Sequence, residues 1–300
     1  MSRAPGRQEG VVASASALVP FGHVGWGYRN RAEFAVRAAE YIADGLDENQ
    51  SIEYVGEGSR EALRAELADM SGIRDRLGVS VLSRICVTPW SEYYRFRPGT
   101  DVVDPESTVH ARVKAVESAI DSGYTGLRVV VDATPVSRRR EQRDAAARFE
   151  FLIDRQLAAR PASTLCGYDL AELGEHAAEF LCLHPFVSEG SSSFRIYAKP
   201  EADFALSGEI DAASTELFAT ALRRTWSPAT EAKVDDNVVI DAQGLEFISQ
   251  RQLRTLDQYA RTYSRDIVLR TGQRIPARLA GVLDLTNVRV ESPSADGQRD

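Results

Sequence analysis

Apolar positions between residues 30 and 170 alternate between helical and strand spacing. In NRAEFAVRAAEYIADGL, Asn30 supplies an N-cap signal, and apolar residues from Phe34 to Ile42 recur on one helical face. Gly45 is expected to end this helix, because glycine is common just beyond a helix C-terminus. The pattern therefore predicts an amphipathic helix near the start of a folded domain.

The same alternation continues along the chain. It predicts, in order, strand 51–55, helix 60–70, strand 79–87, loop 88–104, a helix opening at Asp104, strand 127–132, helix 138–158 and strand 163–168. Alternating strands and helices imply a mostly parallel sheet covered by helices on both faces. We assign residues 21–187 to this first domain, after a tail over residues 1–20 that we expect to be flexible.

A change in composition marks a second domain. HPFVSEGSSSF combines proline, glycine and three successive serines, which is typical of a linker, placed here at 188–193. Beyond it, strand patterns in FRIYAKP, DFALSGEID, NVVIDAQ and DIVLRT alternate with helical patterns in AASTELFATALRR, SQRQLRTLDQYARTY and IPARLAGVLDL. A small α/β domain of four or five strands is expected over 194–292, followed by a flexible tail over 293–300.

Bulk properties narrow the class of protein. Three hundred residues with a net charge of −8 are long enough for two modest domains. No apolar run approaches the roughly 20 residues of a membrane span, and the first residues lack the hydrophobic stretch of a signal peptide, so we expect a cytoplasmic protein. The acidic balance argues against nucleic-acid binding, and the preference for arginine over lysine indicates a GC-rich bacterial genome.

The chemistry-bearing motifs of the first half are sparse. VGEGSREAL has the order strand, glycine turn and helix, but it lacks GK[ST] and places Glu57 where a phosphate would be repelled. We read it as a plain strand-to-helix turn, and we expect no enzymatic activity and no cofactor. Cys86, Cys166 and Cys182 have no CxxC spacing, which argues against a disulfide framework or a zinc ribbon.

We expect the histidines to have mainly structural roles. A metal site needs at least three convergent donors, and the sequence offers only Cys182 and His184 as a near pair, so no metal site is predicted. His23 opens a stretch rich in glycine and aromatic residues, which suits either a ligand-lining loop or an aromatic anchor. Cys166 ends a strand, and open parallel sheets bind ligands at that end. The candidate ligand-binding residues are His23, Tyr28, Glu57, Cys166 and Tyr168.

Several segments of the first half together resemble the MEDS domain, a sensory domain named from methanogen and methylotroph regulators. They are HVGWGYRNRAEFAVRAAEYIADGLDENQSIEYV, LRVVVDAT, FEFLIDRQL and STLCGYDLAEL with the later HPFV. The resemblance spans about residues 21–187. It implies a RecA-like α/β fold without a working phosphate loop and a role in sensing small molecules.

The second half resembles the STAS domain of anti-sigma factor antagonists. Gly208 to Asp211 reads GEID where that family has Gly-Glu-Leu-Asp, and VVIDAQGLEFISQRQL tracks its strand, turn and helix start. The resemblance covers about residues 194–292. It implies that the domain docks on an anti-sigma factor with kinase activity, which phosphorylates a serine at the helix start and so breaks the complex.

The chain departs from the STAS motif at the phosphorylated position. Ser249 stands at the family's aspartate, Gln250 at the acceptor serine and Arg251 at the second serine, followed by Gln252 and Leu253. The expected acceptor hydroxyl is absent. Ser249 is better explained as an N-cap that accepts a hydrogen bond from the helix start, although a kinase could use its shifted hydroxyl.

These inferences combine into one hypothesis. We expect a bacterial signalling regulator whose sensory domain is coupled to a STAS-like module that binds an anti-sigma factor without the usual serine switch. The alternative is a sensor of a small molecule or nucleotide, built on a degenerate RecA-like fold, that acts through another partner. The expected partner-binding residues are Gly208, Glu209, Asp211, Gly244, Phe247, Ser249, Gln250 and Arg251.

Overall fold

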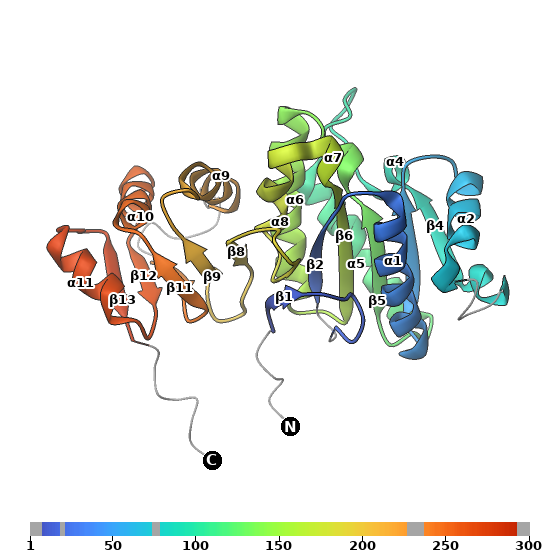
Figure 1. The fold of residues 1–300 in the computed structure, drawn as a ribbon, viewed down its shortest axis with the longest axis horizontal. Helices are drawn as coiled ribbons and strands as arrows, with labels where there is room; N and C mark the ends of the chain where they lie inside the picture. Colours follow the sequence, from blue (N-terminus) through green and yellow to red (C-terminus); the bar gives the residue numbers. More distant parts are fainter. Residues whose placement is uncertain (1–7, 19–21, 74–78, 227–236, 293–300) are drawn as a thin grey trace, which may run out of the picture. The chain divides into compact units, whose positions relative to one another are not determined.

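The computed structural model describes residues 8–18, 22–73, 79–226 and 237–292. The chain divides into two compact units, Met1–Ser192 and Ser193–Asp300, which are described separately here (Figure 1). None of the described helices is both long enough and apolar enough to cross a membrane.

The first unit is built on a seven-stranded sheet in which every pair of neighbours is parallel. Its strand order is β1-β7-β2-β6-β5-β3-β4. The strands are β1 (Gly10–Val12), β2 (His23–Tyr28), β3 (Ser51–Gly56), β4 (Ile85–Pro89), β5 (Leu127–Asp132), β6 (Ala162–Asp169) and β7 (Phe186–Ser188).

Helices cover both faces of this sheet. They are α1 (Arg31–Asp47), α2 (Arg60–Asp69), α4 (Trp90–Tyr93), α5 (Pro105–Asp121), α6 (Arg140–Leu157), α7 (Leu170–Leu173) and α8 (Ala178–Leu181), with 3₁₀ turns at Val79–Arg84, Thr134–Val136 and Gly174–Ala177. The apolar sides of α1 and α2 share one core with Val24, Val130 and Leu165 of the sheet. Successive side chains of a strand point to opposite faces, so the neighbours of Leu165 in β6 face the other layer, which contains α6.

Three local predictions for this unit were wrong. The strand expected over 79–87 begins only at Ile85, because the residues before it form a 3₁₀ turn. The loop expected over 88–104 contains α4. Gly10–Val12, expected in a flexible tail, is a strand that pairs with β7.

Gly45 also behaves differently from the expectation, since it lies inside α1 and is buried. A Cβ atom at this position would lie 2.6 Å from Cδ of Arg128 and 2.6 Å from Cδ1 of Ile52. The glycine therefore allows a close approach between helix and sheet.

The second unit is a six-stranded sheet with three described helices. The strands are β8 (Phe194–Tyr197), β9 (Phe204–Ile210), β10 (Val238–Asp241), β11 (Leu245–Ile248), β12 (Ile267–Arg270) and β13 (Val288–Glu291); the helices are α9 (Thr215–Thr225), α10 (Gln250–Thr262) and α11 (Arg274–Val282). The order is β11-β9-β10-β12-β13, all parallel, with β8 antiparallel to β9. Four or five strands were expected, and the four segments named from the sequence correspond to β8, β9, β10 and β12, so β11 and β13 were not among them. The predicted fold class, a RecA-like parallel-sheet domain followed by a small α/β domain, is confirmed.

Candidate functional site

Strand pairing brings polar side chains together in the interior of the first unit. In the parallel register of β2 and β6, His23 lies beside Thr164 and Gly25 beside Cys166. Because side chains alternate between faces, His23, Cys166 and Tyr168 point to the same side of the sheet. Helix α6 covers this side and contributes Glu150, whose carboxylate accepts a hydrogen bond from the Tyr168 hydroxyl.

Four residues form what we call the His–Glu–Cys cluster: His23, Glu150, Cys166 and His184. Nε2 of His23 lies 3.2 Å from Oε2 of Glu150 and 3.4 Å from Sγ of Cys166. The Cys166 sulfur lies 3.7 Å from the same Glu150 oxygen, and Nε2 of His184 also lies 3.7 Å from it. One donor atom from each residue can be chosen so that all four lie within 4.8 Å of one another.

Neighbouring groups orient the two histidine rings. Nδ1 of His23 is 3.0 Å from Oδ1 of Asp154, one turn after Glu150 on α6. Nδ1 of His184 is 3.0 Å from the carbonyl oxygen of Phe180. Both rings therefore direct Nε2 toward the centre of the cluster.

The cluster is closed to solvent. All four of its residues are buried, and Gly25 makes room for one of them. A Cβ atom on Gly25 would lie 2.9 Å from Cγ and Nδ1 of His184. Gly25 thus serves the packing of this site, a role that was not assigned from the sequence.

Burial and mutual contacts shift the pKa values of the cluster. Burial lowers the pKa of His23, but hydrogen bonds to Asp154 and Glu150 outweigh it and raise that pKa above its ordinary value. Burial raises the pKa of Glu150, and the hydrogen bond from His23 with the nearby imidazoles brings it below its ordinary value. Burial and the neighbouring His23 lower the pKa of His184 to about 3. Burial and the Glu150 carboxylate raise the pKa of the Cys166 thiol well above its usual range.

Cys166, His23 and Asp154 also have the order of a thiol nucleophile, its base and an orienting acid. Two observations weigh against nucleophilic catalysis. The Cys166 side chain is buried, and a reactive cysteine requires a lowered thiol pKa, which is the opposite of the shift here. The geometry suits binding or sensing better than attack on a substrate.

A cleft of about 610 Å³ lies at the carboxyl ends of β2 and β7. It is lined by the end of β2, the α7–α8 segment and the turn after β7, and it includes Trp26, Arg29, Glu175 and Leu181. Leu181 would contact a Cβ atom on Gly25 at 3.2 Å, beside the ring of His184. The cleft is therefore separated from the cluster by about one layer of side chains.

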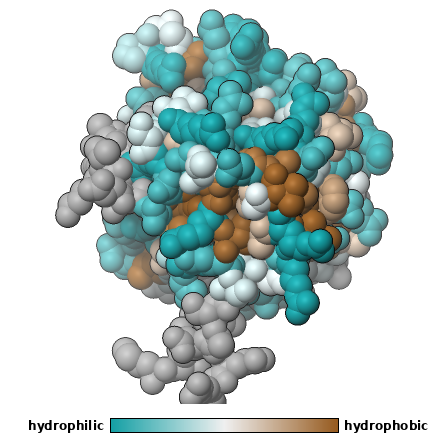
Figure 2. Space-filling model, turned by 90° about the vertical axis from the view of Figure 1, so that its left-hand side faces the viewer, coloured by the Kyte–Doolittle hydropathy of each residue, from teal (hydrophilic) through white to brown (hydrophobic). Residues whose placement is uncertain are grey.

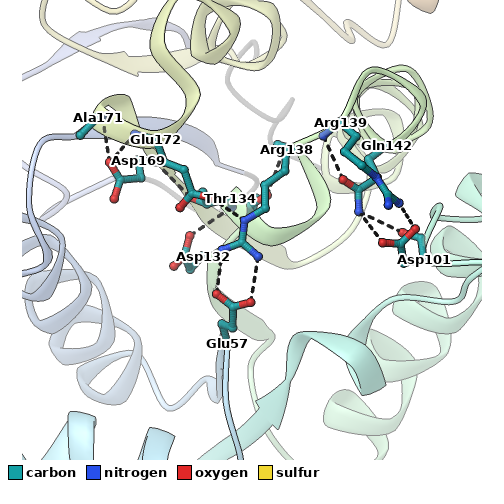
Figure 3. Close-up of polar contacts among 12 residues, drawn as sticks. Glu57, Asp101, Asp132, Thr134, Arg138, Arg139, Gln142, Asp169, Ala171 and Glu172 are labelled. Carbon is teal, nitrogen blue, oxygen red and sulfur yellow. Dashed lines mark hydrogen bonds and ion pairs between the residues drawn. The ribbon is translucent and has the colours of Figure 1, made fainter.

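Ion pairs occupy the carboxyl-end edge of the sheet, where RecA-like relatives would hold a nucleotide (Figure 3). Arg138 donates to both oxygens of Glu57, at 2.9 and 2.8 Å, and also pairs with Glu172. Asp169 accepts from the backbone amides of Ala171 and Glu172 and so caps α7. Ser59 caps α2 directly after the glycine turn. At this edge, charged side chains therefore pair with one another in the place where a nucleotide-binding protein has its phosphate loop.

Of the five candidate ligand residues, the structure brings three together. His23, Cys166 and Tyr168 meet at or beside the cluster, whereas Tyr28 contacts Thr134 and Arg31 near the sheet edge, and Glu57 pairs with Arg138. Sequence reasoning missed Glu150 and Asp154. Their spacing of four residues on one helix was the available signal.

The residues expected to bind a partner lie at one corner of the second unit. Gly208 adopts a φ of 81°, and a Cβ atom there would lie 2.3 Å from the carbonyl oxygen of Ser193, so this position requires glycine. Its neighbour Glu209 is exposed. Asp211 accepts from the amide and hydroxyl of Ser214 at 3.0 and 2.9 Å. Phe247, on the neighbouring strand β11, is 46% exposed.

The start of α10 differs from the expectation in one respect. Ser249 occupies the N-cap position, but its side chain makes no capping hydrogen bond. The hydroxyl oxygen is buried, with no hydrogen-bond partner among the described residues. Gln252 instead joins this corner to α9, since its amide donates to Asp211 O at 3.0 Å and to Thr215 Oγ1 at 2.8 Å.

Apolar side chains gather on one face of the second unit (Figure 2). The large hydrophobic residues exposed on the described part of this unit are Phe247, Ile275 and Val282. The side chain of Gln273, at the start of α11, donates to the carbonyl oxygens of Leu245 and Glu246. These two hydrogen bonds link α11, which carries Ile275 and Val282, to the strand of Phe247.

Comparison with known proteins identifies the first unit. The family model described as MEDS, "MEthanogen/methylotroph, DcmR Sensory domain", matches residues 22–185, more than half of the chain. A search of curated proteins finds no match. The STAS resemblance of residues 194–292 has no supporting family match and stays a prediction. A sensory domain indicates a role in signalling, and the chain belongs to the MEDS family.

Proposed function

We propose that this chain is a signalling regulator in which the MEDS unit senses a chemical signal and the second unit passes the response to a protein partner. The buried His–Glu–Cys cluster carries the sensory part of the proposal. It concentrates two imidazoles, a carboxylate and a thiol in the interior of a domain from a sensory family. Polar groups are costly to bury, so such a concentration is typical of a binding or sensing site.

We further propose that the second unit acts as an anti-sigma factor antagonist without a serine switch. The corner formed by Gly208, Asp211 and the start of α10 supports this role, because exposed Glu209 pairs in register with exposed Phe247 and the first turn of α10 carries exposed Arg251. Aromatic and arginine side chains are enriched at interaction surfaces. The buried Ser249 hydroxyl supports a partner contact that phosphorylation does not release.

A direct binding measurement tests the partner. Purified anti-sigma kinases from the source genome are immobilised, and binding of the full chain is measured by surface plasmon resonance. We expect one of them to bind, and Phe247→Asp to weaken that complex by about ten-fold or more, as at an interface hot spot. Failure of every anti-sigma kinase to bind would overturn this part of the proposal.

The chain offers a matched control for Phe247. Val36 on α1 is 47% exposed, close to the 46% of Phe247, and lies in the other unit. Val36→Asp therefore introduces the same charge at an equally exposed apolar site. We expect it to leave partner affinity unchanged, and an equal loss in both variants would mean that Phe247 is not part of the interface.

The cleft beside the cluster offers a test of the sensory role. A small molecule that binds the folded MEDS unit at 100 times its Kd stabilises it by about 2.7 kcal/mol. Thermal-shift screening with small hydrocarbon derivatives and amphiphilic metabolites checks this. A stabilising hit that Trp26→Ala abolishes would assign its site to the cleft, because Trp26 lines it.

A further inference from the structure

One ring nitrogen of His184 has no hydrogen-bond partner among the described residues. Its Nδ1 lies 3.0 Å from the Phe180 carbonyl oxygen, which can only accept, so Nδ1 carries the hydrogen. Nε2 is then a bare lone pair in the neutral ring. This atom is buried and has no hydrogen-bond partner in the described part of the chain. Its neighbour, Oε2 of Glu150 at 3.7 Å, is another acceptor.

His23, the first residue of β2, presents the same arrangement. Its Nδ1 faces the Asp154 carboxylate at 3.0 Å, which leaves Nε2 directed at Glu150 and Cys166. Imidazoles that bind a metal through one nitrogen almost always donate the other to a carboxylate or a backbone carbonyl. Both kinds of orienting group are present, one for each ring.

We propose that the His–Glu–Cys cluster binds a single divalent transition metal ion of the zinc class. The ligands are Nε2 of His23, Nε2 of His184, Oε2 of Glu150 and Sγ of Cys166. Nitrogen, thiolate and carboxylate donors in this number are those of a tetrahedral zinc site.

The spacing of the donor atoms agrees with that assignment. Four of the six separations among the donor atoms are 3.2, 3.4, 3.7 and 3.7 Å, and one donor atom from each residue can be chosen so that all lie within 4.8 Å. Ligand bonds of about 2.0–2.3 Å in a tetrahedron place neighbouring donors about 3.3–3.8 Å apart. Four of the six separations thus already match a bound ion, and side-chain shifts would have to bring in the remaining two, which join His184 to His23 and to Cys166.

Hydrogen bonds alone explain the cluster less well. A protonated His23 between Glu150 and Asp154 satisfies those three residues, and the Cys166 thiol has the Glu150 oxygen within reach. Nothing in that arrangement uses Nε2 of His184. A cation at the centre uses all four donors, and Tyr168 then holds the second Glu150 oxygen at 2.8 Å.

Four protein ligands complete the coordination of a tetrahedral ion. Such a site binds the metal tightly and leaves no position for a substrate, which agrees with a sensory role. Only the idea that the ion is the sensed signal rests on the proposed sensory function. Metal binding and partner binding are measured separately, so each can fail without the other.

The test uses the full chain without an affinity tag, stripped with a chelator and dialysed. Zn²⁺ is titrated by calorimetry, and Co²⁺ is added to a parallel sample and followed by absorption. We expect one equivalent of either ion to bind, with the intense visible bands of tetrahedral cobalt and a thiolate-to-cobalt charge-transfer band in the near ultraviolet.

Variants assign the ligands. Cys166→Ser should abolish the charge-transfer band, and Asp154→Asn should weaken metal affinity by about 10–100-fold through the orientation of His23. Cys182→Ser is the matched control, because Cys182 is equally buried but lies outside the cluster. It should keep the complete cobalt spectrum, and circular dichroism verifies that each variant is folded.

Two results would overturn the proposal. The first is sub-stoichiometric binding of both ions by the wild-type chain, which needs no variant to interpret. The second is a cobalt spectrum that folded Cys166→Ser leaves unchanged, since the ion would then be bound elsewhere.

Discussion

Nε2 of His184 lies 3.7 Å from Oε2 of Glu150 in the interior of the MEDS unit, and the imidazole nitrogen has no hydrogen bond to any described residue. Two acceptors thus face each other where water does not reach. Burial and the neighbouring His23 keep His184 neutral here, although the Glu150 carboxylate by itself favours a protonated ring. Acid should therefore destabilise the folded chain through His184, because its ring would have to become charged in the interior.

The metal-free chain is expected to be most stable near pH 6.5. The pKa of His184 in the folded state is about 3. Below pH 6.5 its ring therefore binds a proton in the unfolded state but not in the folded state. The unfolding free energy then falls by about 1.4 kcal/mol per pH unit. The pKa of His23 is raised, so its contribution is complete below pH 6.5 and is lost as the pH rises through the folded value.

Urea unfolding with a chelator present, between pH 5 and 9, measures this dependence. Carboxylates such as Glu150, whose pKa is lowered, change the unfolding free energy mainly below about pH 4.5. The pH dependence between 5 and 6.5 is therefore assigned to His184. His184→Gln should flatten that range, whereas the exposed His110→Gln should not. An acid slope that persists in folded His184→Gln would show that another group causes it.

Two helical glycines should respond oppositely to alanine. At Gly45 the new methyl would lie 2.6 Å from Cδ of buried Arg128, so Gly45→Ala should destabilise the MEDS unit by about 1–3 kcal/mol through overpacking. At Gly281 on α11 no atom lies within 4 Å of the added Cβ. Gly281→Ala should therefore stabilise the second unit by about 0.5–1 kcal/mol. Calorimetric scans that resolve the two units measure both, and a stabilising Gly45→Ala would contradict the close packing.

Two serines at helix starts should also differ. Ser59 accepts from the Ala62 amide at 3.3 Å, whereas the Ser249 hydroxyl makes no capping bond. Ser59→Ala should cost about 0.5–2 kcal/mol, and Ser249→Ala should change stability by less than about 0.5 kcal/mol. Denaturant titration compares them. If Ser249→Ala costs as much as Ser59→Ala, its hydroxyl does cap α10 in solution.

The full chain should not bind a nucleotide. The turn after β3 lacks the lysine of a phosphate loop, and the Glu57 carboxylate, held by Arg138, stands near the position a phosphate would take. Titration with ATP and Mg²⁺ should give no saturable heat. A saturable isotherm would restore the nucleotide-sensing alternative, and Arg138→Ala would then show whether the ion pair limits access.

Local spacing determined most of the fold. The helix that starts after Asn30 buries apolar residues at helical spacing, and the strand over 127–132 contains the apolar run Val129 to Val131, so each can be recognised from neighbouring residues alone. The glycine-rich strand from His23 to Tyr28 was not recognised, because its inward positions at Gly25 and Gly27 carry no side chain to show the period. Cys166 and Tyr168 could be proposed as site residues because a strand end is visible in the sequence.

The tertiary structure alone decided which groups meet. His23 and Asp154 are 131 residues apart and touch because β2 pairs with β6 and α6 crosses above them. His184 joins them only because Gly25 leaves its ring room. Sequence patterns record which face of an element is buried, but the choice of neighbour depends on strand order and packing over the whole unit. The cluster therefore became visible only when those distant segments were folded together.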